Sequence, residues 1–265
     1  LIESLGVKPF DDQYKIANPQ PWNRLSFRPG EVGTHYLAWP RLPELSRIAP
    51  MNGLMEKRGG ALIDIDRAAL AGRMKTYFDS SIDWASLKLL GAPLARDAAR
   101  YNAEEARRTA LATSVYDDRA IVRYIVRAFD VRHAYYTDIR PIWNEPRPDL
   151  WAQFSCGNRF LMSRPSGVAN PEGAPVNYTS CLGDNDAQRG HSYYIPFEDV
   201  SPAHGMIPEK RKSNLSTGAR AYLSQLGFPD PDNDKAARET IWLHALAVTN
   251  SARYLAEHAD GLAID

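Results

Sequence analysis

The stretch that decides the fold is IVRYIVRAFDVRHAYY, residues 121–136. Ile121, Arg123, Ile125 and Arg127 share one parity, with apolar and aromatic residues between them. Period-two patterning of β-branched and aromatic residues predicts strands. We therefore expect a strand from Ile121, another up to Tyr136, and similar strands at 159–162 and 193–197.

The wider window from Arg119 to Arg164 is basic and aromatic. It holds eight arginines, no lysine, eight aromatic residues and four acidic residues, which leaves it at about +4 in a chain of formal net charge zero. Guanidinium groups bind phosphates and guanine edges in bidentate fashion, and aromatic rings offer faces to bases. The composition points toward nucleic acid.

Before this window, the pattern changes twice. Residues 1–50 are rich in proline and aromatic residues, which predicts a linker or packing arm without long helices. Residues 61–65 then read as a short strand, and Asp66 is placed to cap a helix carrying Leu70, Met74 and Tyr77. Residues 83–113 are rich in alanine and arginine and predict helix.

After the window, residues 165–190 carry almost no helix or strand signal and predict a long loop. The C-terminal third ends in a helical pattern that Asn250-Ser251 is expected to break. Its apolar stripe is expected to lie in the core: Ile241, Ala245, Val248, Ala252 and Leu255. We expect an α+β fold, with a mixed, mostly antiparallel curved sheet, helices packed around it and a C-terminal helical segment.

Length and composition set limits on function. The chain has 265 residues, of which 44% are hydrophobic, and no apolar run approaches the roughly 20 residues needed to span a bilayer. Without a signal-peptide pattern, we expect a cytoplasmic protein with no membrane partner. Cys156 and Cys181 are expected to be unpaired, partly buried thiols. The start at Leu1 and the stop at Asp265 suggest a piece of a longer polypeptide, in which a local basic face would be enough to contribute to nucleic-acid binding.

Catalytic motifs do not stand out. The chain has no glycine-rich phosphate loop, no GxSxG and no HExxH. Four histidines could act as general bases, but sequence places no nucleophile and carboxylate beside any of them: His133, His191, His204 and His244. We expect no catalysis, cofactor or metal in this chain, although a hydrolase site that sequence does not reveal remains an alternative.

Five segments, in order, resemble the C-terminal target-recognition region of type ISP restriction-modification enzymes and related N6-adenine DNA methyltransferases. They are residues 39–58, 62–79, 121–136, 140–161 and 242–254. In the third, which is similar to the family pattern YRPFDxRxxYY, Arg127, Phe129, Asp130 and Arg132 are retained, whereas Val126 and Ala128 replace the tyrosine and proline. The match covers roughly residues 38–265.

The resemblance implies a function for residues 51–265. They would be the DNA target-recognition domain of an adenine-specific methyltransferase or restriction-modification enzyme in phage defence. A methyltransferase domain of the same polypeptide would bind S-adenosylmethionine and flip the adenine. The rival is a protein-interaction or scaffolding domain of a phage-defence complex, in which the arginines would serve a protein interface.

Candidate contacts to double-stranded DNA fall into three groups. Base readers are expected on irregular segments: Arg140, Asn144, Arg147, Arg159, Arg164 and the polar loop from Asn177 to Arg189. The 127–132 segment is expected to shape the fold, with Asp130 paired to an arginine and Phe129 buried, or else to contact the DNA backbone. Within that segment, Arg127 and Arg132 are the candidates for backbone contact. The remaining candidates are Arg123 on its strand and the run Lys210, Arg211 and Lys212, which would contact phosphates or be simply solvated.

Overall fold

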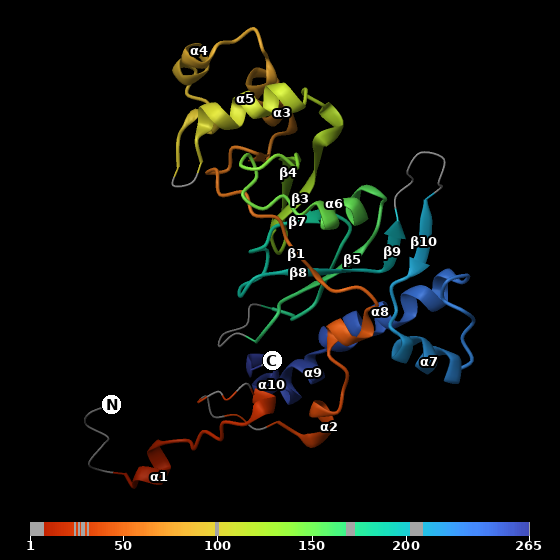
Figure 1. Cartoon of the computed structure of the whole chain (residues 1–265). Coiled ribbons are helices and arrows are strands. Elements are labelled where there is room, and N and C mark those ends of the chain that lie inside the picture. Colours follow the sequence, from red (N-terminus) through yellow and green to blue (C-terminus); the bar gives the residue numbers. More distant parts are fainter. Residues whose placement is uncertain are drawn as a thin grey trace.

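The computed structural model describes residues 8–23, 25, 27, 30, 32–98, 101–167, 173–201 and 209–264. The chain is elongated, with helices at both ends and sheets between them (Figure 1). At one end lie α3 (Arg67–Phe78), α4 (Trp84–Leu89) and α5 (Ala103–Thr113), and at the other lie α7 (Thr217–Gln225), α8 (Lys235–Thr249), α9 (Ala252–Glu257) and α10 (Ala259–Ile264).

The decisive stretch forms the hairpin that was predicted. Strands β3 (Ile121–Arg127) and β4 (Asp130–Tyr135) pair antiparallel, with Ile121 opposite Tyr135 and a register shift between Ile125 and Arg127. The sheet order is β2-β4-β3-β7, where β2 is Ile63–Asp64 and β7 is Leu182–Gly183. Strand β7 runs parallel to β3, while the other pairs are antiparallel.

Helix α3 begins as its sequence predicts. The side chain of Asp66 accepts hydrogen bonds from the backbone N–H groups of Ala68 and Ala69, which caps the first turn. The single helix predicted over 83–113 is wrong, because Gly91 adopts a positive φ of 69° and the chain forms a short 3-10 turn, η3 (Pro93–Ala95), before α5 starts. Arg107, only 4% exposed, joins α5 to the end of α3 by donating to three backbone oxygens: Tyr77 O, Asp79 O and Ile82 O.

A second sheet, of order β1-β8-β5-β6, forms the centre of the molecule. Its strands are β1 (Met51–Asn52), β8 (Tyr193–Pro196), β5 (Phe160–Ser163) and β6 (Asn177–Thr179). Every residue of β5 and β8 is buried, and alternate side chains enter different cores: Phe160 and Met162 join the first, Leu161 and Ile195 the second. One short sheet is therefore covered on both faces.

Several short strands were not expected. The predicted long loop 165–190 contains β6 and β7, because two- and three-residue strands carry almost no periodicity of their own. Strands β9 (Glu198–Ser201) and β10 (Lys210–Ser213) pair antiparallel in a separate ribbon, so the basic run 210–212 lies on a strand. Helix α6 (Pro148–Ser155) is a further element beyond the predicted pattern.

The C-terminal helical segment forms, with a break where it was predicted. Helix α8 ends at Thr249, and the Ser251 side chain caps α9 by accepting from the N–H of Tyr254. The predicted core stripe is only partly correct, because Ile241 is buried whereas Ala252 is exposed. Trp242, which is not part of the predicted stripe, is fully buried and stacks on Phe197 in the second core.

The proline-rich N-terminal region holds only short helical turns: α1 (Phe10–Gln13), η1 (Pro21–Asn23), α2 (Thr34–Leu37) and η2 (Leu42–Leu45). After α2, Trp39 stacks on Tyr254 and Tyr36 stacks on His258, which joins this region to the C-terminal helices. Leu42 and Leu45 pack against the second core. Residues 34–45 thus lie along the C-terminal end of the molecule.

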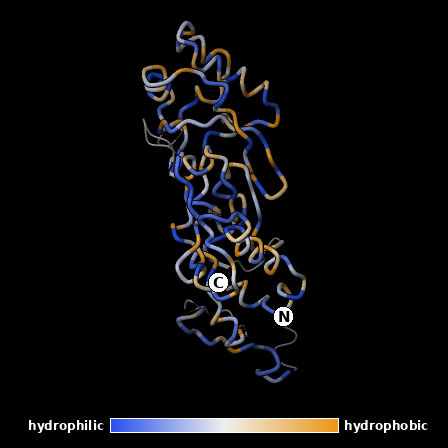
Figure 2. Tube along the Cα trace, turned by 90° about the vertical axis from the view of Figure 1, so that its right-hand side faces the viewer, coloured by the Kyte–Doolittle hydropathy of each residue, from blue (hydrophilic) through white to orange (hydrophobic). Residues whose placement is uncertain are grey.

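The two cores and the mixed sheets confirm the α+β fold class. The first core joins the α3–α5 end to the β3–β4 sheet, and the second joins the central sheet to α7 and α8. Figure 2 shows hydrophobic stretches toward both ends of the elongated chain. The hairpin therefore stands on the first core, which keeps its strands rigid while leaving the tip in solvent.

Candidate nucleic-acid interface

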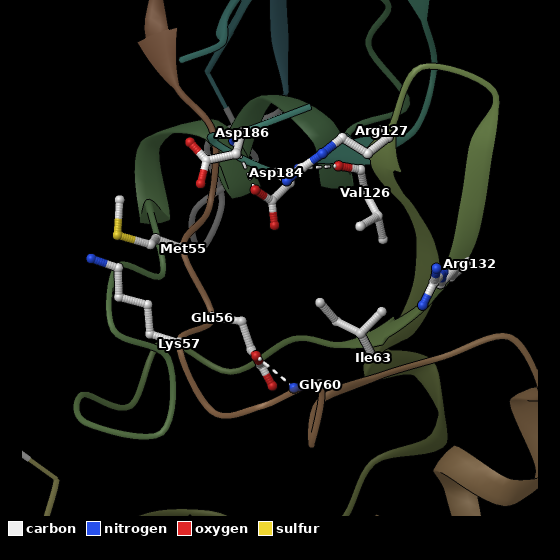
Figure 3. A pocket seen from close by; sticks show the side chains of 10 residues that line it. All are labelled: Met55, Glu56, Lys57, Gly60, Ile63, Val126, Arg127, Arg132, Asp184 and Asp186. Atoms are coloured by element: carbon white, nitrogen blue, oxygen red, sulfur yellow. Dashed lines mark hydrogen bonds between the residues drawn. The ribbon is translucent and has the colours of Figure 1, made fainter. Parts of the chain in front are cut away.

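A hollow of about 280 Å³ opens beside the β3–β4 hairpin. Three segments form it: the hairpin, the loop at 55–60 and the loop after β7 (Figure 3). Its wall combines apolar side chains with both signs of charge: Met55, Glu56, Lys57, Gly60, Ile63, Val126, Arg127, Arg132, Asp184 and Asp186. The hollow is thus lined with donors as well as acceptors.

Backbone hydrogen bonds hold the three segments together. Asp184 N donates to Ile125 O over 2.9 Å, and Leu54 N donates to Gly183 O over 2.9 Å. Gly53 lies so close to the backbone of Asp184 that a Cβ at this position would clash with it. Because this close approach requires glycine, the loops meet at a fixed place on the sheet.

Asp184 forms the floor on one side. Its Oδ2 accepts from the Tyr124 hydroxyl at 2.8 Å, and its Oδ1 accepts from Asp186 N at 2.7 Å. Burial raises the pKa of the Asp184 carboxyl, although both hydrogen bonds act in the opposite direction. Each carboxylate oxygen already has a partner in the fold, so Asp184 primarily anchors the loop.

The opposite side is formed by the loop at 55–60. Glu56, 8% exposed, accepts from three backbone N–H groups of its own loop, those of Arg58, Gly60 and Leu62. Lys57 adopts a positive φ of 52° and its ammonium points away from the centre of the hollow (Figure 3).

Arg127 and Arg132 come from the hairpin. The Arg127 side chain is exposed and extends toward Asp184 and Asp186 (Figure 3). Arg132 forms a bidentate pair with Asp130, at 2.9 and 2.7 Å, which lowers the pKa of Asp130. This confirms the predicted pairing of Asp130 with an arginine.

A second hollow of about 270 Å³ adjoins the first, since both are lined by Arg127 and Asp186. Gln188, Arg189 and Gly190 complete its wall. The structure thus brings together Arg127, Arg132 and Arg189, which are up to 62 residues apart in sequence. Arg123 is exposed on β3 opposite His133, nearer the middle of the hairpin.

Arg140, Asn144 and Arg147 gather around one acid, Glu145. Arg140 pairs with Glu145 and donates to Asn144 O, and the Arg147 guanidinium lies 3.7 Å from the same carboxylate. Met55 and Glu145 exchange backbone hydrogen bonds of 3.0 Å, which places this group next to the hollow. Arg140 is exposed, while Asn144 and Arg147 are half-buried.

The prediction that Phe129 is buried is wrong. It lies at the hairpin tip with a φ of 66° and a relative exposure of 102%. Arg127 pairs with Asp130 across the strands, so Ala128 and Phe129 form the turn and project beyond the sheet. A two-residue turn carries its side chains past the last strand pair, so the ring does not reach the core.

Arg159, Arg164 and Arg211 serve the fold at the α8 end. Arg159 pairs with Glu239 and lies over the Phe197 ring, and Arg211 pairs with Glu198. Arg164 is 8% exposed and donates to Leu262 O, and burial lowers its pKa. Little of the Arg164 side chain is therefore accessible to a base. Lys210 and Lys212 are exposed on β10, away from the hollow.

Other candidate groups are dispersed. Among the described residues no cluster of three potential metal ligands occurs, and neither cysteine is paired. His191 contacts Asp186 at 3.1 Å, whereas His133 lies on β4 and His244 is exposed on α8. His204 lies outside the described residues. None of the described helices is long and apolar enough to cross a membrane.

Sequence reasoning did not single out Lys57, and it included Asp184 and Asp186 only as members of the polar loop from Asn177 to Arg189. They come from two separate loops and acquire a common surface only through β1, β3 and β7. The Gly-Asp-Asn-Asp run at 183–186, with its turn-forming residues, was the one local sign of a tight, functional loop.

The fold and this surface define a mixed α+β domain that presents charged loops on a rigid sheet. A family model, the Type ISP C-terminal specificity domain, matches residues 50–265, and the chain belongs to this family. No curated protein matches the chain.

Solved structures share the fold. The chain is similar to the DrdV–DNA complex, determined by cryo-electron microscopy (TM-score 0.55, 16% identity, 98% of this chain and 24% of that one). It is also similar to the ATP-dependent Type ISP restriction-modification enzyme LlaBIII bound to DNA (TM-score 0.56, 12% identity, 83% of this chain and 14% of that one). A third similar structure is a nuclease-deletion mutant of the Type ISP restriction-modification enzyme LlaGI in complex with a DNA substrate mimic (TM-score 0.51, 11% identity, 89% of this chain and 21% of that one). The chain spans less than a quarter of the length of each of these three proteins.

Proposed function

We propose that this chain reads DNA sequence through the paired hollows beside the β3–β4 hairpin. The observation that carries the proposal is that a specificity-domain fold gathers Arg127, Arg132 and Arg189 on one surface. Three loops with separate positions in sequence supply the wall. Such loops can change from one relative to another while the sheet beneath them stays the same.

The mixture of charges supports base reading over phosphate binding alone. A phosphate surface needs only cations, whereas base edges in the major groove present both acceptors and donors. Arginine donates to guanine, and a carboxylate accepts from the amino group of cytosine. Asp186, whose side chain is 52% exposed, and Arg127 offer both functions within one hollow.

We further propose that the parent polypeptide is an adenine-specific DNA methyltransferase with restriction activity in phage defence. The motifs at 121–136 and 242–254, together with the family match, support this assignment. Its methyltransferase domain would bind S-adenosylmethionine and extrude the adenine, and the chain described here would fix the position on DNA. Duplex DNA and that domain are the proposed partners.

Selection from a random oligonucleotide pool by the intact polypeptide tests the proposal. The wild-type protein should enrich one sequence. Arg127→Gln with Arg189→Gln should relax the preference at one or two positions, each worth about 1–3 kcal/mol of discrimination. Arg140→Gln with Arg147→Gln, tested in parallel, asks whether the group around Glu145 also reads bases.

Arg119→Gln is the matched control. Arg119 is highly exposed and paired to Asp117, but it lies at the other end of β3 from the hairpin tip. It should leave the enriched sequence unchanged. If the wild-type protein enriches no sequence, the recognition function is refuted, and a protein-interaction role is favoured.

A further inference from the structure

Phe129 is exposed without any structural reason. Its relative exposure of 102% means that the ring gains nothing from packing in this chain. Its φ of 66° is a left-handed conformation, which glycine, asparagine and aspartate adopt far more readily than an aromatic residue. Both the solvent contact and the backbone conformation are unfavourable for phenylalanine, and no packing within the described residues compensates for them.

The paired strands hold the backbone of the hairpin tip in place. Strand β3 is paired on both sides, by β4 and β7, and its Tyr124 is fully buried beneath the turn. The acid next to the ring, Asp130, is paired with Arg132. Arg127 is exposed two residues before the ring. A rigid stem thus ends in an aromatic ring with guanidinium groups behind it.

We propose that the Phe129 ring inserts between neighbouring base pairs of the bound duplex. This inference rests on the proposed DNA-reading function and adds a mechanism to it. Apolar side chains inserted in this way partly unstack a base step and kink the duplex. Arg132 stands at the base of the turn, where it can contact a phosphate that flanks the opened step.

Insertion also provides specificity without a hydrogen bond to a base. Pyrimidine–purine steps unstack most easily, so the wedge favours sites with such a step at the position of the ring. The paired hollows lie beside the same hairpin and would read base edges a short distance away.

The experiment uses the intact polypeptide and duplexes of the selected sequence carrying 2-aminopurine at successive positions. The fluorescence of 2-aminopurine rises when the base loses its stacking. Wild-type protein should raise it at one step besides the position of the extruded adenine. Phe129→Ala should abolish the rise and weaken binding about tenfold, as expected when one aromatic stacking contact is lost. Phe129→Trp should retain both.

Two controls distinguish this role from others. Leu89→Ala removes a side chain of similar exposure, 89%, at the end of α4, and should change nothing. Phe129→Ala should leave the salt dependence of binding unchanged, because no charge is removed. Its unfolding temperature without DNA should equal that of the wild type.

Two outcomes would overturn the insertion. One is that no 2-aminopurine position other than that of the extruded adenine responds to wild-type protein. The other is that Phe129→Ala binds DNA normally but lowers the unfolding temperature of the DNA-free polypeptide, which would place the ring against another domain. In either case the enrichment of one sequence by wild-type protein would still support the recognition function, so the two hypotheses fail separately.

Discussion

Arginines in two regions of the molecule lie in contrasting surroundings. Beside the hairpin, Arg127 and Arg189 are exposed and face a hollow. At the α8 end, Arg238 and Glu198 have side-chain exposures of 15% and 13%, and Arg238 also donates to two backbone oxygens. The comparison shows that arginine content alone does not locate a nucleic-acid surface, because burial and carboxylate partners decide what each guanidinium does.

The largest effect is expected from breaking the ion pair at the α8 end. Arg238→Met leaves Glu198 with Arg211 alone and removes the hydrogen bonds to Pro231 O and Asp232 O. Breaking a fully buried pair costs roughly 3–5 kcal/mol. Here we expect about 2 kcal/mol, because both groups keep some solvent contact and one partner remains. Urea unfolding of the chain measures the loss.

The matched change beside the hairpin is Arg127→Gln. It should change the free energy of unfolding by no more than about 0.5 kcal/mol, as for most surface substitutions. DNA affinity should respond in the reverse order, with Arg127→Gln reducing it and folded Arg238→Met retaining it. Equal destabilisation by both substitutions would show that the arginines beside the hairpin and those at the α8 end do not differ in this way.

A smaller effect is expected from Asp186→Asn in the hollow. The carboxylate lies where DNA phosphates would approach and repels them. Removing its charge should strengthen binding to DNA of unrelated sequence about threefold, while reducing the preference for the selected sequence. Competition binding at two salt concentrations measures both quantities. Weaker binding to all sequences would show instead that Asp186 mainly orients the loop through His191.

Local signals in the sequence predicted the hairpin, the Asp66 cap and the break before Ser251, because each depends on residues close together in the chain. Strands β6 and β7 are too short to show a period, and β7 exists because Leu182 pairs with Tyr124, 58 residues earlier.

The site was predicted less well for the same reason. The ion-pair partner of Arg159 is Glu239, 80 residues away, and no pattern in the sequence near Arg159 predicts this pairing. The hollow likewise unites three loops that sequence does not connect. Residue type indicated the chemistry of the site, but only long-range packing decides which arginines remain available to DNA.

The smallest expected effect concerns the Asp130–Arg132 pair at the base of the hairpin tip. Arg132 lowers the pKa of Asp130 below its ordinary value of 3.8. The pair therefore stabilises the folded hairpin at neutral pH, and this contribution is lost as the pH falls through the lowered pKa and the carboxylate is protonated. Amide hydrogen exchange of β3 and β4 should be slightly faster in Asp130→Asn than in wild type at pH 7. At strongly acidic pH, unfolding by urea should no longer distinguish the two proteins, because protonated aspartate resembles asparagine. If the difference in stability between the two proteins grew on acidification, Asp130 would act through another group. Added salt should reduce the difference at pH 7, because the pair is exposed.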